Sequence, residues 1–256
     1  MNADPYEVFL RTVNARSLTA QSRKRLFFVG FRQREADGTA QEAQEAQEAQ
    51  EAPASEFNLP DIPDLGLRAD DILETEEELV ASGLLDDYTV SEEHLSKLLE
   101  CKKWSRRGGM TDTLAWGDKV CSTLVAHYGS SIPRGTSQLV PRPAPHRPRR
   151  FSPRECARLM GFPNSFRLAG KGAAASVGLW LRAMYRAFGN SVCPPVVAVL
   201  AGAMLHHQDA SGATGAPGAR DWRELGRSAA LRLALQARMP IVTVDAELGV
   251  GTPSSK

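Results

Sequence analysis

The chain has 256 residues, of which 42% are hydrophobic, and its 31 Lys and Arg against 30 Asp and Glu give a formal net charge of +1. This length and apolar content exclude a disulfide-stabilised mini-protein and a fully disordered chain. No apolar run reaches the ~20 residues of a membrane span, no secretory signal is present, and the four cysteines form no Cys-x-x-Cys pair. We therefore expect a reduced, intracellular protein with one or two domains, no membrane partner and no zinc site.

The near-neutral total hides a strong separation of charge along the chain. Residues 1–34 carry a net charge of +5, residues 35–100 carry −18, residues 101–171 carry +11, and the remainder carry +3. A chain with this distribution presents at least two basic surfaces separated by an acidic insert.

Two strands are expected near the N-terminus. Over residues 6–11, the set Tyr6, Val8 and Leu10 alternates with the set Glu7, Phe9 and Arg11. Leu26 to Phe31 reads Leu-Phe-Phe-Val-Gly-Phe and is apolar at nearly every position. The first pattern is typical of a strand, and the second predicts a strand that is buried on both faces. A domain that begins in this way needs further strands as partners.

The middle of the chain changes character twice. Between Gln41 and Ala52 a Gln-Glu-Ala triplet repeats four times, and its period of three fits neither helix nor strand, so residues 36–55 are predicted to be a solvated low-complexity insert. Thr89 to Glu92 has the spacing of a capping box, which predicts a helix from Thr89 to about Trp104. Residues 105–150 lack periodicity and should form loops and short strands with a positive face.

The C-terminal part predicts a series of helices. A helix that ends at Met160 is predicted by Ser152 as N-cap, Pro153 at the first position and Glu155 three residues after the cap. Arg154 and Arg158 lie near Glu155 at helical spacings, so Glu155 is expected to cap the helix and to pair with one of these arginines. Further helices are expected over residues 176–188 and from Pro194 to about residue 206. A linker over residues 209–219 then precedes an amphipathic helix and a tail.

Three stretches, in this order, resemble conserved motifs of the cytosine-C5 DNA methyltransferases. Gln21, Arg23 and Arg25 resemble the Gln-x-Arg-x-Arg motif of that family. Residues 150–163 (Arg-Phe-Ser-Pro-Arg-Glu-Cys-Ala-Arg-Leu-Met-Gly-Phe-Pro) resemble the penultimate motif, and residues 189–197 (Gly-Asn-Ser-Val-Cys-Pro-Pro-Val-Val) resemble the last. The resemblance covers residues ~6 to 207, with residues 36–149 only loosely matched.

This resemblance implies a fold and a reaction. The fold is α/β: the C-terminal part of a class I, Rossmann-like methyltransferase domain dependent on S-adenosylmethionine, plus an irregular α+β target-recognition region. Enzymes of the family flip a cytosine out of the duplex, add a Cys thiolate to C6 and transfer the methyl group of S-adenosylmethionine to C5. DNA is then the expected partner, and a nuclear location is expected.

The resemblance also assigns residues to the base pocket. Arg23 and Arg25 stand two apart at the start of a strand, so their side chains should point to one side and, with Gln21, support the base, a phosphate or the catalytic loop. The alternative is that both arginines are solvated charges that protect a strand edge.

For the cofactor, the resemblance points to Asn190, Ser191 and Val192, whose motif in the family lies against the methionine-binding part of the pocket. The alternative is an ordinary helix end followed by a helix start. Cys193 is followed by two prolines, whereas the family nucleophile is preceded by proline, so we interpret Cys193 as a small buried residue.

Phosphate contacts are expected from the basic stretch just before the penultimate motif. Prolines hold this stretch extended, and its arginines can displace counterions from a nucleic acid. The candidate side chains are those of Arg142, Arg147, Arg149 and Arg150.

Three motifs of the family are missing from the sequence: Pro-Cys with the nucleophile, Glu-Asn-Val, and the Gly-rich Phe-x-Gly-x-Gly turn. In the family these belong to the N-terminal half, so the chain looks like the C-terminal half of a DNA (cytosine-5-)-methyltransferase that is inactive alone and has a separate N-terminal half as partner. The expected division is: 1–35, end of the catalytic domain; 36–55, acidic insert; 56–149, target-recognition region; 150–208, C-terminal motifs; 209–256, linker, helix and tail.

Three alternatives stay open at this point. The chain could be a non-catalytic nucleic-acid-binding or regulatory module, a relative that methylates transfer RNA, or an inert remnant. The motifs present do not separate DNA from transfer RNA; the ~115 residues between the first and second motif favour a region that reads a duplex groove.

Overall fold

The computed structural model describes residues 6–32, 56–101, 114–130, 138–170, 172, 174, 176–210 and 222–238. Its strands are β1 (Tyr6–Asn14) and β2 (Lys24–Arg32), and its helices are α2 (Glu76–Ala81), α3 (Leu85–Tyr88), α4 (Glu92–Glu100), α7 (Pro153–Leu159), α8 (Val177–Asn190), α9 (Pro194–Ala210) and α10 (Trp222–Arg238), with single 3-10 turns at Ala15–Ser17 and Ala69–Asp71. The predicted linker at 209–219 was wrong at its start, because α9 continues to Ala210. The rest of that linker, the predicted insert at 36–55 and the tail lie outside the described residues.

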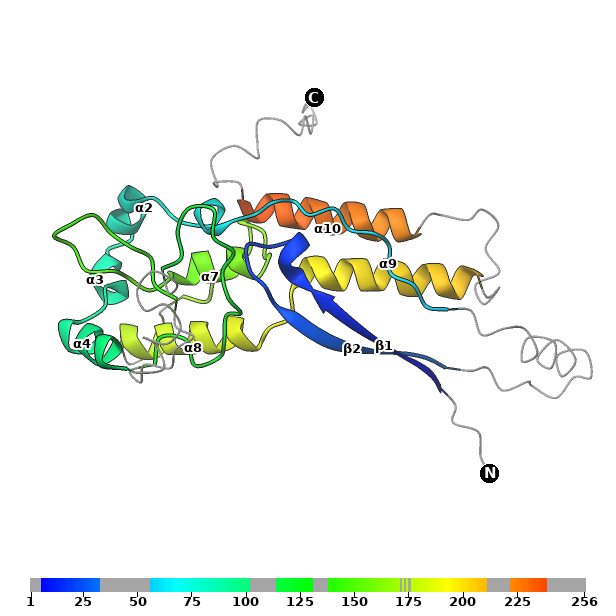
Figure 1. Ribbon diagram of the computed structural model, residues 1–256, viewed down its shortest axis with the longest axis horizontal. Coiled ribbons are helices and arrows are strands. Elements are labelled where there is room, and N and C mark those ends of the chain that lie inside the picture. The colour runs from blue at the N-terminus through cyan, green and yellow to red at the C-terminus, as the bar shows by residue number, and fades with distance from the viewer. Residues whose placement is uncertain are drawn as a thin grey trace, which may run out of the picture.

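Both predicted strands are present, and they form one antiparallel hairpin in which Tyr6 pairs with Arg32 and Asn14 with Lys24. The prediction that the second strand is buried on both faces was wrong, because Leu26 and Phe28 on one face of β2 are exposed. One face of this hairpin packs against the helices: Phe9 and Phe31 surround the ring of His207 from α9, and the ring centroids of Phe31 and His207 lie 4.4 Å apart. Figure 1 shows α10 beside α9, with the hairpin on the other side of α9. The hairpin thus takes its support from the C-terminal helices.

The predicted start of α7 is confirmed in detail. The Ser152 hydroxyl accepts a hydrogen bond from the Glu155 amide at 3.1 Å, and the Glu155 carboxylate accepts one from the Ser152 amide at 2.8 Å. The helix ends before Gly161, whose φ of +81° suits glycine. A Cβ at this glycine would lie 2.8 Å from the Pro195 ring, so the end of α7 directly contacts the start of α9.

The predicted start of α4 was wrong by two residues. Ser91 is its N-cap, whereas Thr89 ends α3, where its amide donates to the Leu85 carbonyl at 3.1 Å. Val90 then donates to the Pro148 carbonyl at 3.0 Å, which holds the chain extended between the two helices. The helix also ends at Glu100 rather than at Trp104. The start of α4 therefore depends on backbone pairing with residues 148–149, which lie too far along the chain for a local sequence pattern to reveal.

The stretch from Val177 to Gln208 is long and apolar enough, by length and composition, to cross a membrane. Half of its most apolar window is buried inside the fold, and Ser191 to Cys193 interrupt it between α8 and α9. These helices contribute Trp180, Tyr185, Phe188, Val196 and Val199 to a core that also includes residues of the hairpin, of α10 and of the segment 56–149. Residues 56–149 are the segment predicted to recognise the target, and we use the name recognition region for them only as a label. Burial in the core accounts for their apolar character.

A buried ion pair joins the recognition region to α7. The Glu155 carboxylate is fully buried and accepts two hydrogen bonds from the Arg149 guanidinium, each 2.7 Å long. The amides of Ser152 and Glu74 donate to the same carboxylate at 2.8 Å each. The predicted pairing within the helix was wrong: Glu155 pairs with Arg149, which precedes α7, while Arg158 donates to Asn164 and to the Ile72 carbonyl. Because four donors surround the Glu155 carboxylate, its charge is compensated in the interior.

Replacing Glu155 with alanine is expected to reduce the free energy of unfolding by about 3–5 kcal/mol, because the Arg149 charge would stay buried without a partner. Urea titration followed by circular dichroism measures this loss. Glu93→Ala is the matched control, since it removes an exposed i,i+4 pair with Lys97 and should leave the midpoint almost unchanged. Equal losses in the two variants would contradict a special role for the buried pair.

Candidate functional site

Gln21 lies fully buried where three parts of the chain meet. Its side-chain amide donates to the Leu159 carbonyl at 2.6 Å, and its amide oxygen accepts from the Leu124 amide at 3.1 Å. Leu159 is the last residue of α7, and Leu124 belongs to the recognition region. One short side chain therefore links the segment before β2 to both.

Arg23 makes a second set of bonds from the same segment. Its guanidinium donates to the carbonyls of Leu124 at 2.8 Å, Gly189 at 3.1 Å and Ser191 at 2.9 Å. Burial, with a smaller contribution from neighbouring Arg25, lowers the pKa of Arg23. Two of the three acceptors lie at the C-terminal end of α8, where a positive charge is favourable.

Leu124 is thus held on both sides of its backbone, its amide by Gln21 and its carbonyl by Arg23. Backbone bonds extend this arrangement: the Cys121 amide donates to the Ala20 carbonyl at 2.7 Å, and the Ser22 amide donates to the Cys121 carbonyl at 2.8 Å. We call residues 20–23 and 121–124, together with the carbonyls of Leu159, Gly189 and Ser191, the joint.

The joint requires a close approach at Gly189. A Cβ at this position would lie 2.3 Å from the Val125 carbonyl carbon and the Ala126 nitrogen, far inside van der Waals contact. Because these are backbone atoms, they cannot turn aside as a flexible side chain could. The end of α8 therefore sits directly on the recognition region, and glycine is needed for that contact.

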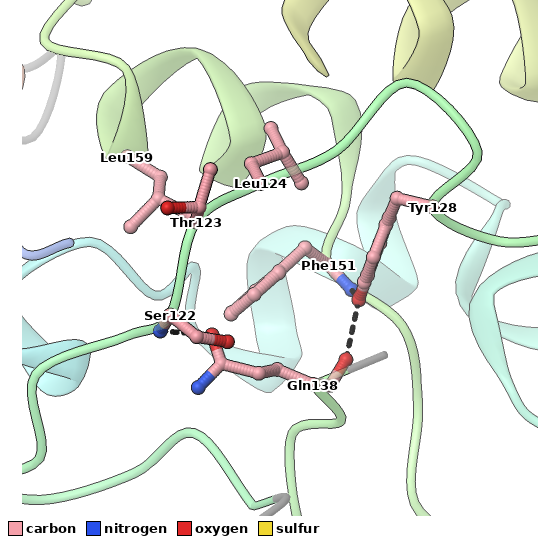
Figure 2. A pocket seen from close by; sticks show the side chains of 7 residues that line it. All are labelled: Ser122, Thr123, Leu124, Tyr128, Gln138, Phe151 and Leu159. Carbon is pink, nitrogen blue, oxygen red and sulfur yellow. Dashed lines mark hydrogen bonds between the residues drawn. The ribbon is translucent and has the colours of Figure 1, made fainter. Parts of the chain in front are cut away.

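Packed side chains fill the space beside the joint. Figure 2 shows the Tyr128 hydroxyl donating to the Gln138 carbonyl at 2.7 Å and the Ser122 amide donating to the Gln138 side-chain oxygen at 2.9 Å. The side chains that line the hollow leave no room for a water-sized molecule; they are those of Ser122, Thr123, Leu124, Tyr128, Gln138, Phe151 and Leu159. This region is a packed interface within the protein.

The three residues predicted for the base pocket separate into two kinds. Arg23 is 5% exposed and points to backbone carbonyls, whereas Arg25 is exposed and bonds only locally, to the Lys24 carbonyl at 2.7 Å. The prediction that Arg23 and Arg25 point to one side was wrong, because β2 begins at Lys24 and Arg23 precedes it. Gln21 and Arg23 position other segments, and Arg25 is available to a ligand.

The four arginines predicted to contact phosphate also separate. Arg149 is buried and paired with Glu155, so its prediction as a phosphate contact is corrected. Arg142 pairs with Glu76, which belongs to the acidic stretch of residues 35–100, at 2.5 Å. Arg147 is exposed and Arg150 is partly exposed. Charge density alone did not reveal that two of these arginines have carboxylate partners in the structure.

The predicted cofactor residues form the turn between α8 and α9. Asn190 is exposed, as is Val192 with 60% of its surface accessible. The Ser191 hydroxyl donates to the Phe188 carbonyl at 2.8 Å, and its own carbonyl accepts from Arg23. Ser191 therefore shapes the turn, while Asn190 and Val192 expose an amide and an apolar side chain.

The interpretation of Cys193 as a small buried residue is confirmed. Burial raises the pKa of its thiol to about 11 and that of Cys121 to about 12. Burial also raises the pKa of the Cys156 thiol well above its usual range. A thiol serves as a nucleophile in its thiolate form, so these three residues are not placed for that role.

Arg23→Met is expected to lower the free energy of unfolding by at least about 1–3 kcal/mol, because it leaves buried carbonyls without donors. Hydrogen exchange should accelerate at the amides of residues 121–124, which the joint orders. Arg25→Met is the matched control and should change neither stability nor exchange. Unchanged exchange at residues 121–124 in Arg23→Met would contradict the joint.

Alkylation of the native chain is expected to spare Cys121, Cys156 and Cys193 at pH 8. With a pKa near 11, about one Cys193 thiol in 1,000 is ionised at that pH, against about one in ten at the ordinary value near 9. Mass spectrometry after a timed iodoacetamide pulse measures this, with the urea-unfolded chain as the fully reactive reference. Rapid native labelling of Cys193 would contradict its burial.

Comparisons with known proteins agree with this arrangement. The sequence model of the family described as "C-5 cytosine-specific DNA methylase" matches residues 1–206. The type II methyltransferase M.NlaX of Neisseria lactamica is 27% identical over 202 residues, covering 77% of this chain and 51% of that protein. A DNA-cytosine methyltransferase of Escherichia coli K12 is 48% identical over 60 residues, covering 22% of this chain and 11% of the relative.

Among solved structures, the Entamoeba histolytica methyltransferase EhMeth superposes with a TM-score of 0.50 at 16% identity, covering 78% of this chain and 54% of that one. The chain is a mixed α/β protein with the Rossmann-like methyltransferase fold, and it spans about half the length of M.NlaX and EhMeth. Since the family model covers most of its length, the chain belongs to the C-5 cytosine-specific DNA methylase family.

Proposed function

We propose that this chain is the target-recognising half of a DNA (cytosine-5-)-methyltransferase and that it also supplies one side of the cofactor pocket. The joint is the observation that carries this proposal. Through Gln21 and Arg23, it brings the recognition region, the end of α7 and the turn after α8 into direct contact. A protein that reads a target and acts on it needs such a fixed relation between the two surfaces.

Within this proposal the exposed cations act on the nucleic acid. Arg147 and Arg150 contact phosphates and release counterions, which favours binding without selecting a sequence. Arg25 is the exposed arginine nearest the joint along the chain, and its guanidinium offers donors to a flipped base or to its phosphate. A DNA partner and the expected nuclear location are both parts of the proposal.

S-adenosylmethionine is the cofactor that the family implies, and the turn after α8 fits one side of it. The Asn190 amide can donate to and accept from a polar ligand group, and the exposed Val192 side chain offers an apolar contact. When bound, the cofactor supplies an electrophilic methyl group. The contribution of this chain is to bind and orient it, and Arg23 holds the turn in place through the Ser191 carbonyl.

In this proposal the nucleophile comes from another polypeptide or segment. The sequence has no Pro-Cys pair, and Cys121, Cys156 and Cys193 are buried with raised pKa values. This favours a second candidate function as well, in which the chain acts as a DNA-binding module without catalysis. The two functions differ in one property: whether a catalytic half becomes active when this chain is added.

Transfer of a tritiated methyl group from S-adenosylmethionine to duplex DNA tests the proposal. The chain alone should give no transfer. Addition of the portion of M.NlaX that has no counterpart in this chain should give transfer above that of either part alone, and Arg25→Ala should reduce it by at least tenfold. Salt-dependent DNA binding without any transfer would favour the non-catalytic module, and transfer to transfer RNA instead of DNA would reassign the substrate.

A further inference from the structure

The β1–β2 hairpin has a second face, opposite the one packed on α9, and this outer face is apolar. Its five large side chains are between 51% and 70% exposed; they are Tyr6, Val8, Leu10, Leu26 and Phe28. They alternate along each strand, and the register places Leu10 opposite Phe28. They therefore share one side of the sheet.

An apolar outer face is unusual for a sheet that meets water. A strand in an antiparallel sheet with one solvated side alternates apolar and polar residues, whereas Leu26 to Val29 is apolar at every position, as in strands covered on both sides. The structure buries one side of this run, through Phe27 and Val29, and leaves Leu26 and Phe28 exposed. The sequence pattern is therefore that of a strand covered on both faces, but the described residues of this chain cover one face only.

The chemistry of the outer face favours a protein partner over a nucleic acid. Its two charged side chains, those of Lys24 and Arg32, stand at opposite ends of β2, opposite Asn14 and Tyr6, and the apolar residues lie between them. A contiguous apolar surface of this kind marks a protein interface in soluble proteins. The basic candidates for phosphate contact, Arg147 and Arg150, lie in the recognition region instead.

The length of the relatives indicates the occupant. This chain corresponds to 51% of M.NlaX and 54% of EhMeth, so about half of each has no counterpart here. We infer that the outer face is the docking surface for a catalytic half, an α/β unit that lays an apolar layer over Leu10, Leu26 and Phe28. This inference rests on the proposed function and adds to it the place and chemistry of the contact.

The test measures binding of the full chain to the portion of M.NlaX that lacks a counterpart here, by biolayer interferometry. Phe28→Asp should weaken binding at least tenfold, and Leu26→Asp should act in the same direction, because each places a carboxylate in an apolar contact. Val80→Asp is the matched control: Val80 is 60% exposed on α2, away from the hairpin (Figure 1), and the change should alter binding less than twofold. Circular dichroism and urea midpoints confirm that the variants fold.

Three results would overturn the inference: no binding by the unmodified chain, equal binding by Phe28→Asp, or a loss equal to that in Val80→Asp. Sedimentation that reveals a homodimer abolished by Phe28→Asp would assign the face to a second copy instead. Binding to phosphatidylcholine vesicles that Phe28→Asp abolishes would assign it to a membrane.

Methyl transfer by the same mixtures separates this inference from the proposed function. Docking that is sensitive to Phe28→Asp but gives no methyl transfer refutes the function and leaves the docking face standing. Transfer that Phe28→Asp does not reduce refutes the docking face and leaves the function standing.

Discussion

The grip on the backbone of Leu124 is the interaction on which the arrangement of this molecule depends. Gln21 accepts from its amide and Arg23 donates to its carbonyl, so two side chains of one short segment fix a single residue of the recognition region. Burying a guanidinium is unfavourable unless its donors are satisfied. Here the carbonyls at the end of α8 accept the remaining hydrogen bonds of the Arg23 guanidinium, and the partial negative charge of the helix C-terminus further stabilises its positive charge.

The helix α7 extends this constraint because both of its ends are fixed. At its start, Glu155 connects the helix to Arg149 and to the amide of Glu74. At its end, Gln21 bonds to the Leu159 carbonyl, and Gly161 lies against Pro195 of α9. The polar links between α7 and the recognition region are buried, and buried polar contacts tolerate displacement poorly.

Local patterns in the sequence predicted the parts of the fold that local physics determines. The Ser152 capping box and the two strands of the hairpin follow from neighbouring residues, and the structure has them where they were expected. The start of α4 did not follow in this way, because Val90 bonds to the Pro148 carbonyl, 58 positions along the chain.

The candidate site was less predictable for the same reason. Arg23 and Arg25 are identical in type and nearly adjacent, but the acceptors that bury Arg23 lie more than 100 residues away, at Leu124, Gly189 and Ser191. The role of Leu124 could not be predicted from its residue type, because it bonds through its backbone amide and carbonyl, which residues of almost every type have. A count of basic residues likewise could not show that Arg149 has a buried carboxylate partner.

The contact at Gly189 limits how the recognition region can be exchanged between relatives. The backbone of Val125 and Ala126 lies against this glycine, and residues 121–124 are bonded to residues 20–23. A transplanted segment with cut points inside 121–126 would carry foreign geometry into the joint and displace α8. An exchange of this segment with a relative therefore needs boundaries outside residues 121–126, which belong to the fixed frame of the protein.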